Sequence, residues 1–287
     1  MALVLNLLKP CRSLWLAVVA LLFLTSSLAR AAEPDALRIQ GSTTLLPAVH
    51  RLAEAFSQGH PGVEFDVRGG GSVQGIQALI SSSADIASSS RFLNTEEVRA
   101  ATSRGIYPVP FQIAHDALIP IVHKSNTVRG LSLEELGKVF RGGVRNWKAL
   151  GGPDLPVQLV MRDQSSGTLQ VWRERIGGEP GAGMPVTRVE SSADVVRAVS
   201  RDAGAIGYIG LAGLSAAIKP LRVDGVIGSM GNVRSGRYAL ARPLFLFTNG
   251  WPEGAQLDFI NFVLDPGGGQ RVIEEAGLLP LYPRDRR

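Results

Sequence analysis

The chain has 287 residues, 45% hydrophobic and 19% charged, which suits a folded core and excludes a disordered polymer. Its formal charge of +5 falls to +2 (27 basic residues against 25 acidic) without residues 1–31, which hold Lys9, Arg12, Arg30 and no acidic residue. Because no run of Lys and Arg with interleaved aromatics remains, we expect no nucleic-acid partner.

The N-terminal segment has the pattern of a secretory signal peptide. Basic residues precede an apolar run at 14–24, and Ala29-Arg30-Ala31 fits the small-x-small rule for cleavage after residue 31. The run is shorter than the roughly 20 residues of a membrane span, although a retained anchor is the alternative. Cys11, the only cysteine, precedes the run, so there is no lipobox. We expect a cleaved, soluble protein that is periplasmic or secreted and has no thiol chemistry.

The rest of the chain alternates short apolar strands with helical patterns, which is typical of an α/β fold. In chain order we predict a strand at 37–39, a helix at 45–56, a strand at 63–67, a helix at 73–80, and a short strand at 85–87 that runs into Ser88-Ser89-Ser90-Arg91.

The second half continues the alternation. Ser132 and Glu135 form a capping box for a helix that reaches residue 140. The remaining predicted elements are strands at 117–122, 157–161, 205–209 and 244–247 and helices at 169–176, 192–199 and 257–264, with a surface loop at 177–183.

Three clusters of glycine and hydroxyl residues stand directly before predicted helices. They are Gly41-Ser42-Thr43-Thr44, Gly69-Gly70-Gly71-Ser72 and Arg162-Asp163-Gln164-Ser165-Ser166-Gly167-Thr168. Helix N-termini carry unpaired N–H groups and a partial positive charge, which attract anions. Together the clusters predict a site for a small tetrahedral oxyanion.

Each cluster also has an ordinary structural interpretation. Ser42 or Thr43 can be a helix N-cap, and the glycine run can be a loop that needs unusual φ values. Arg162 can pair with Asp163 or Glu174. As a planar, charged donor four residues before a Ser-Gly-Thr helix start, however, Arg162 suits bidentate binding of an oxyanion.

Other chemistry is weakly represented. The four histidines are scattered without carboxylates at metal-ligand spacing, and no nucleophile elbow, Walker motif or dinucleotide fingerprint is present. We therefore expect no catalytic residue, no metal and no cofactor, and a protein that is not an enzyme.

The chain resembles the periplasmic phosphate-binding proteins, the solute receptors of phosphate ABC importers, over nearly its whole mature length. The resemblance rests on the three clusters and on the order and spacing of Ala84-Asp85-Ile86-Ala87 with Ser89-Ser90-Arg91, Phe140-Arg141-Gly142-Gly143 with Asn146-Trp147, Gly204-Ala205-Ile206-Gly207-Tyr208 and Phe259-Ile260-Asn261-Phe262-Val263.

The resemblance implies a two-lobed clamp of periplasmic-binding-protein type II, each lobe an α/β sheet flanked by helices. It places lobe 1 at 32–114 and 242–287 and lobe 2 at 115–241. It implies a monomer that binds inorganic phosphate between the lobes and delivers it to membrane permease subunits.

The ligand-binding residues implied by the resemblance are Ser42, Thr43, Thr44, Ser72, Ser89, Arg162, Ser166, Gly167 and Thr168. Many members carry an aspartate at the position aligned with Ser89, where it accepts a proton from phosphate and rejects sulfate. Ser89 can accept through its oxygen, and Asp163 is an alternative acceptor. The role of Arg91, toward ligand or toward a carboxylate, stays open.

Three other functions remain as alternatives. The missing aspartate leaves sulfate, molybdate, tungstate or a phosphorylated metabolite as the ligand. An exported phosphatase on the same fold lacks a nucleophile with a base in reach. A surface scaffold is the third.

Overall fold

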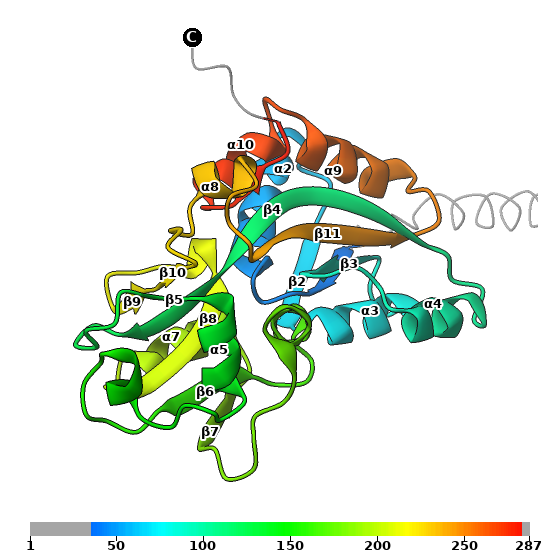
Figure 1. Cartoon of the computed structure of the whole chain (residues 1–287). Coiled ribbons are helices and arrows are strands. Elements are labelled where there is room, and N and C mark those ends of the chain that lie inside the picture. The colour runs from blue at the N-terminus through cyan, green and yellow to red at the C-terminus, as the bar shows by residue number, and fades with distance from the viewer. Residues whose placement is uncertain (1–35, 283–287) are drawn as a thin grey trace, which may run out of the picture. The chain divides into compact units, whose positions relative to one another are not determined.

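The computed structural model describes residues 36–282, so the predicted signal peptide lies outside the described residues. A mixed parallel and antiparallel sheet with helices packed against it confirms the predicted α/β class (Figure 1). The strand order is β2-β1-β3-β11-β4-β8-β6-β7, with β12 and β9 also paired to β4, and a separate two-stranded sheet pairs β10 with β5.

Three parallel strands at one end of the sheet carry the first two clusters. β1 (Leu37–Gly41) lies between β2 (Phe65–Gly70) and β3 (Ile86–Ser89). α2 (Leu46–Gly59) follows β1 with Pro47 in its first turn, where a missing N–H is tolerated. α3 (Ser72–Ile80) follows β2. The first two clusters therefore lie at the carboxyl ends of adjacent strands.

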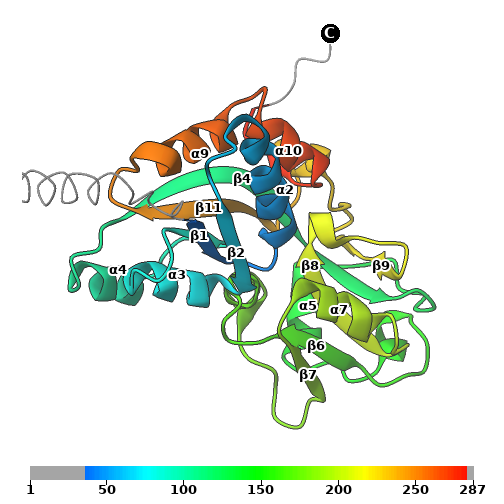
Figure 2. The same ribbon diagram turned by 180° about the vertical axis from the view of Figure 1, so that it is seen from behind.

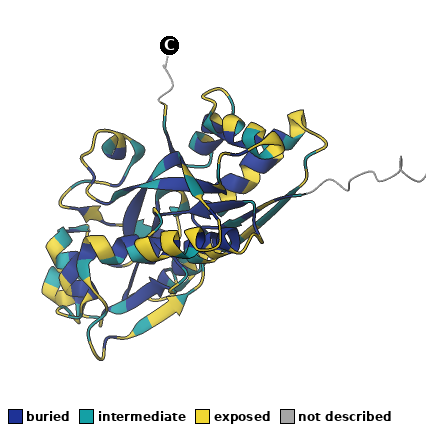
Figure 3. Cartoon of the chain, turned by 90° about the vertical axis from the view of Figure 1, so that its right-hand side faces the viewer, coloured by how far each residue is buried: buried dark blue, intermediate teal, exposed yellow. Residues whose placement is uncertain are grey.

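Helices cover both faces of these strands. α2 lies on one face together with α9 (Gly254–Leu264) and α10 (Gly269–Glu275). α3 and α4 (Thr95–Thr102) lie on the other face (Figure 2). Figure 3 shows buried and exposed residues on the same helices, as expected for helices that cover a sheet.

One long strand joins the two ends of the sheet. β4 (Pro108–His123) pairs through its first half with β11 (Ala241–Asn249) and through its second half with β8 (Ala205–Gly210), antiparallel in both cases. The short strands β9 (Ile218–Pro220) and β12 (Leu279–Pro280) also pair with β4.

The third cluster lies beyond β8. β6 (Gln158–Arg162) runs parallel to β8 and to β7 (Val186–Val189) and delivers the chain into α6 (Gly167–Trp172), which continues as a π-helical turn, Arg173–Gly177. The other elements here are β5 (Gly130–Leu131), α5 (Leu133–Phe140), α7 (Ser192–Val199), β10 (Arg222–Val223), α8 (Met230–Arg234) and the 3-10 turns Trp147–Leu150 and Leu211–Gly213.

The buried apolar side chains divide into separate cores. The largest draws on residues 117–240 and Leu279, whereas two others draw on residues 37–114 and 244–278. β4 contributes to cores at both ends of the sheet, so its middle is where the two parts of the fold meet. Among residues 36–282, no helix combines the length and apolarity that a membrane crossing requires.

The structure departs from the predicted elements in understandable places. β4 begins at Pro108 instead of residue 117, because polar residues interrupt its apolar pattern in the first half. β2 starts two residues late and continues through Gly69 and Gly70. α4, which is not predicted, has few apolar residues and depends on the Asn94–Glu97 capping box.

Candidate functional site

The ends of β1 and β3 bring serine hydroxyls from two segments together. Ser42 and Ser90 share a short hydroxyl–hydroxyl hydrogen bond, and the Ser42 N–H donates to the Ser88 carbonyl at 2.9 Å. The Ser90 N–H donates to the Ser72 hydroxyl at 3.0 Å. All three serine side chains are buried. The first two clusters therefore form one continuous polar surface.

The third cluster closes directly onto the second. The Ser165 hydroxyl donates to the Gly70 carbonyl at 2.7 Å, and the Val73 N–H donates to the Ser165 carbonyl at 3.0 Å. A Cβ on Gly71, whose φ is +107°, would lie 2.5 Å from that carbonyl oxygen. One on Gly167 would lie 2.4 Å from the Ser72 hydroxyl oxygen. Glycine is required at both positions for the backbones to approach.

A second contact joins the first and third clusters. The hydroxyls of Thr44 and Thr168 lie 3.1 Å apart, and both are buried. The Arg242 guanidinium donates to both, at 3.0 Å to Thr168 and 3.4 Å to Thr44. The clusters thus converge through Ser42, Thr44, Ser72, Ser90, Gly167 and Thr168. We add Thr43, Arg162 and Ser166, which lie in the same segments, and call the whole set the hydroxyl cage.

Arg162 is a buried charge without a carboxylate partner among the described residues. It is 1% exposed, and no carboxylate lies within ion-pair distance among residues 36–282. Its Nη2 donates to the Glu190 carbonyl at 2.5 Å and its Nη1 to the Ser192 hydroxyl at 3.5 Å, whereas the buried Nε has no partner. The expected alternative, an ion pair with Asp163 or Glu174, is not formed.

Burial lowers the pKa of Arg162 from its ordinary value because it penalises the charged form, and repulsion from Arg242 lowers that pKa further. Asp163, Tyr208 and Asp194 oppose the shift. The Asp163 carboxylate itself accepts from the Ser165 N–H at 3.0 Å and lies 2.6 Å from the Ser165 hydroxyl, whose single hydrogen it shares with the Gly70 carbonyl. It is therefore engaged within its own turn.

Tyr208 supports the strand end that carries Arg162. Its hydroxyl accepts from the Arg162 N–H at 3.4 Å, and its ring stacks on Trp172 with centroids 4.3 Å apart. Burial raises the pKa of the Tyr208 phenol, so the ring stays neutral. Trp172 in α6 therefore packs against the ring that contacts the backbone of Arg162.

The remaining cage residues divide between capping and free groups. Ser166 is the N-cap of α6, and its hydroxyl accepts from the Leu169 N–H at 3.2 Å. Ser42 accepts from the N–H groups of Thr44 and Leu45, although α2 begins later and has no side-chain cap. The buried Thr43 hydroxyl has no partner.

Ser89 does not face the cage. Its hydroxyl donates to the Arg91 carbonyl at 2.8 Å and accepts from the Arg91 N–H at 3.3 Å. Alternation along β3 places the next residue, Ser90, against Ser42 and Ser72 instead. Among the described residues Ser90 therefore contacts Ser42 and Ser72, whereas the role of Ser89 as a ligand-binding acceptor stays a prediction.

Arg91 is occupied by a carboxylate. Its two Nη atoms bind Glu97 at 2.7 and 2.6 Å, both side chains are 7% exposed, and its Nε donates to Gln170 of α6. This geometry answers the question that the sequence leaves open, because the Arg91 charge is fully compensated by a fork-shaped pair.

Sequence reasoning missed Asp116 and Arg242. They lie in the mostly apolar strands β4 and β11 and form a buried ion pair at 2.8 Å. A single charge inside an apolar strand is the signal that could have identified them, since unpaired charges are rarely buried.

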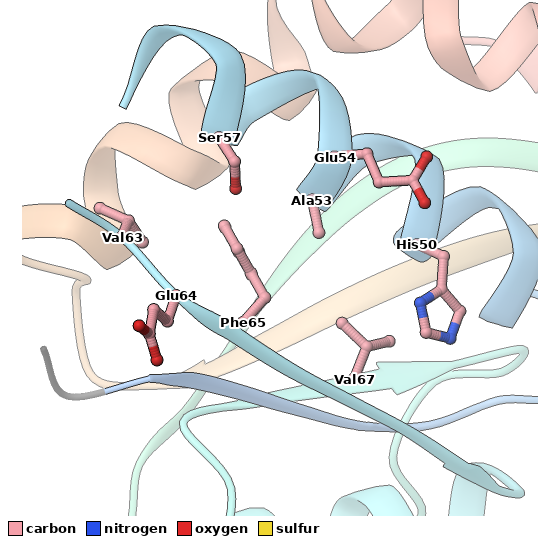
Figure 4. A pocket seen from close by; sticks show the side chains of 8 residues that line it. All are labelled: His50, Ala53, Glu54, Ser57, Val63, Glu64, Phe65 and Val67. Atoms are coloured by element: carbon pink, nitrogen blue, oxygen red, sulfur yellow. The ribbon is translucent and has the colours of Figure 1, made fainter. Parts of the chain in front are cut away.

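A groove of about 640 Å³ lies elsewhere, between α2 and the edge strand β2. Figure 4 shows Phe65 and Val67 in its wall and the carboxylates of Glu54 and Glu64 at its sides. No residue of the hydroxyl cage lines it. Its acidic character is unfavourable for an anion.

Comparisons with known proteins identify the family of the chain. A family model described as "PBP superfamily domain" matches residues 28–266. The chain is 31% identical over 258 residues to protein SphX of Synechococcus elongatus, covering 84% of this chain and 76% of that protein. It is 29% identical to the phosphate-binding protein PstS of Bacillus subtilis, covering 85% and 80%.

Two solved structures superpose on the fold of this chain. A substrate-binding protein of a phosphate ABC transporter from Clostridium perfringens, solved with bound phosphate, superposes with a TM-score of 0.80 at 28% identity, covering 86% of this chain and all of that one. A phosphate transport receptor from Vibrio cholerae gives 0.69 at 27% identity, with the same coverage.

Proposed function

Because the chain belongs to the PBP superfamily, we propose that it is a non-enzymatic solute-binding protein that captures inorganic phosphate and delivers it to an ABC importer. The names of its relatives support this function, since PstS of Bacillus subtilis is a phosphate-binding protein and the Clostridium perfringens structure holds phosphate. Permease subunits as partners, a monomeric state and a periplasmic or secreted location belong to the same proposal.

The observation that carries the proposal is the state of Arg162. A guanidinium that is 1% exposed and lacks a carboxylate loses most of its hydration without recovering it. An anion bound in the hydroxyl cage supplies the missing charge and accepts a bond from Nε. Thr43, Ser72, Thr44 and Thr168 then donate hydroxyl hydrogens, as in a charge-assisted oxyanion site.

Selectivity follows from the acceptors that the cage contains. Near neutral pH phosphate carries at least one proton that must be donated, whereas sulfate carries none. Asp116 and Asp163 already accept hydrogen bonds, whereas the Ser90 hydroxyl lies against that of Ser42 in the cage. We infer that Ser90 accepts the phosphate proton through its hydroxyl oxygen, a weaker barrier to sulfate than a carboxylate.

We propose that the clamp divides into lobes at the boundaries that the family resemblance implies. Residues 32–114 and 242–287 form lobe 1 in this proposal, and residues 115–241 form lobe 2, which is consistent with the division of buried apolar residues. Contacts of Ser165 with Gly70 and Val73 then join the lobes around the ligand. Their formation on binding is the closure step.

Isothermal titration of the purified exported protein, stripped of bound anion, tests the function. We expect tight binding of phosphate and binding of sulfate that is weaker by at least about tenfold. Equal binding of both anions makes the protein a general tetrahedral-oxyanion receptor. Absence of heat with phosphate, sulfate, molybdate and tungstate contradicts the proposed site.

A further inference from the structure

A buried ion pair lies where the two lobe-crossing strands pair. Asp116 of β4 and Arg242 of β11 are direct partners in the antiparallel register. Asp116 Oδ2 accepts from Arg242 Nε at 3.2 Å and from Nη2 at 2.8 Å. Asp116 Oδ1 accepts from the Leu211 N–H at 2.8 Å. With both side chains at most 2% exposed, the guanidinium is held at a fixed place and angle.

The other N–H groups of Arg242 are directed at the hydroxyl cage. Nη1 donates to the Thr168 hydroxyl at 3.0 Å and to the Ser90 carbonyl at 3.4 Å. Nη2 donates to the Thr44 hydroxyl at 3.4 Å. One side chain therefore contacts the segments that follow β1 and β3 and the start of α6.

The chemistry of these groups determines which way the hydroxyl hydrogens point. A guanidinium has donors and no acceptor, whereas a threonine hydroxyl has one hydrogen and two lone pairs. Thr44 and Thr168 must therefore accept from Arg242, and neither can give its hydrogen to that side chain. Their hydrogens stay available for each other, across 3.1 Å, or for an anion in the cage.

We infer that Arg242 is a positioning residue of the anion site. It fixes Thr44 and Thr168 as hydrogen-bond donors to the ligand, and Asp116 holds it in place. The inference rests on the proposed function, because it requires an anion to receive those hydrogens. It also ties ligand binding to the strand pair β4 and β11, since one guanidinium links a hydroxyl from each lobe to the crossing.

A double-mutant cycle in phosphate titrations tests this coupling. Thr168→Val keeps the shape and removes the hydroxyl, and Arg242→Lys keeps a buried charge but loses the fork that reaches both hydroxyls. Each single change is expected to raise the phosphate Kd about tenfold, in line with one charge-assisted hydrogen bond. The double variant is expected to bind only about tenfold to twentyfold more weakly than wild type, well short of the roughly hundredfold product.

Two further variants keep the test decisive. If Arg242→Lys does not fold, Asp116→Asn combined with Arg242→Met removes both charges together and replaces it in the cycle. Lys148→Met breaks the exposed pair with Asp154 and is the control, with an unchanged phosphate Kd. Urea unfolding of every variant separates affinity from stability.

The outcomes are distinguishable. Wild-type binding with a strongly non-additive cycle supports the inference. Wild-type binding with additive effects of Arg242 and Thr168, or with no effect of Arg242, overturns the inference alone and leaves the receptor function standing. Failure of the wild-type protein to bind phosphate overturns the proposed function, and this inference with it.

Discussion

Arg91 and Arg162 are both buried beside the same cage, yet their charges are handled in opposite ways. Arg91 has a two-pronged ion pair with Glu97, whereas Arg162 has only a carbonyl, a hydroxyl and an unpartnered Nε. A buried charge is tolerated when it is paired and hydrogen-bonded. We therefore propose that Arg91 serves the fold and that a bound anion compensates the charge of Arg162.

The largest expected effect comes from removing the uncompensated charge. Arg162→Met is expected to raise the phosphate Kd at least about 100-fold, or ~3 kcal/mol, because Arg162 is the one charged residue of the cage and the neighbouring Arg242, among the described residues, is already paired with Asp116. Isothermal titration measures the change. A Kd within threefold of wild type would contradict the difference between the two arginines, since Arg162 would then serve only the fold, as Arg91 does.

The paired arginine predicts the converse result. Glu97→Gln leaves Arg91 buried without its carboxylate, so the free energy of unfolding in urea is expected to fall by about 3 kcal/mol. The phosphate Kd of the protein that stays folded is expected to change less than about threefold. A loss of affinity comparable with that of Arg162→Met would mean that Arg91 is also a ligand.

The neighbouring residues Ser89 and Ser90 are expected to differ in their effect on phosphate affinity. Ser90→Ala removes the hydroxyl that is bonded to Ser42, keeps the backbone N–H that donates to Ser72, and is expected to weaken phosphate binding about tenfold. Ser89→Ala removes a hydroxyl bonded only to the Arg91 backbone and is expected to change the Kd less than about twofold. Equal effects of the two variants would mean that Ser89 also belongs to the anion site.

The smallest expected effect comes from an exposed ion pair, Arg38 with Asp85. Burial raises the pKa of Asp85, but hydrogen bonds and attraction from Arg38 outweigh it and hold that pKa below 3.8. The pair therefore stabilises the fold above pH 3.8, and this contribution is lost as the pH falls through the lower pKa of the folded protein.

Asp85→Asn is accordingly expected to flatten the acid end of the stability curve by less than about 1 kcal/mol, without changing phosphate affinity. Urea unfolding between pH 2.5 and 6 measures the effect. An unchanged slope would show that this pair contributes nothing to folding.

Much of the candidate site could be predicted from the sequence, because each of the three clusters has the same local chemistry. Glycines and hydroxyls before the helices predicted the segments that meet in the cage, and Arg162 stood out as a charged residue at a strand end. Ser89 and Ser90 show the limit. Adjacent residues on a strand face opposite ways, and a run of three serines gives no indication of which one faces inward.

Long-range pairing explains what sequence reasoning missed. Asp116 and Arg242 are 126 residues apart in the sequence. Each of them, taken alone, only interrupts the apolar pattern of its strand. Only the antiparallel register of β4 and β11 brings them together. Likewise α4 is stabilised by its capping box and not by an apolar stripe, so hydrophobic periodicity does not reveal it.

Equilibrium unfolding of wild type and Arg162→Met, with and without phosphate, tests the central claim most directly. Without phosphate, we predict that Arg162→Met is at least as stable as wild type, because it removes a buried uncompensated charge. At phosphate about 100-fold above the wild-type Kd, wild type should gain about 3 kcal/mol and the variant almost nothing. A variant that is less stable without phosphate, or that gains as much from it as wild type, would contradict the account.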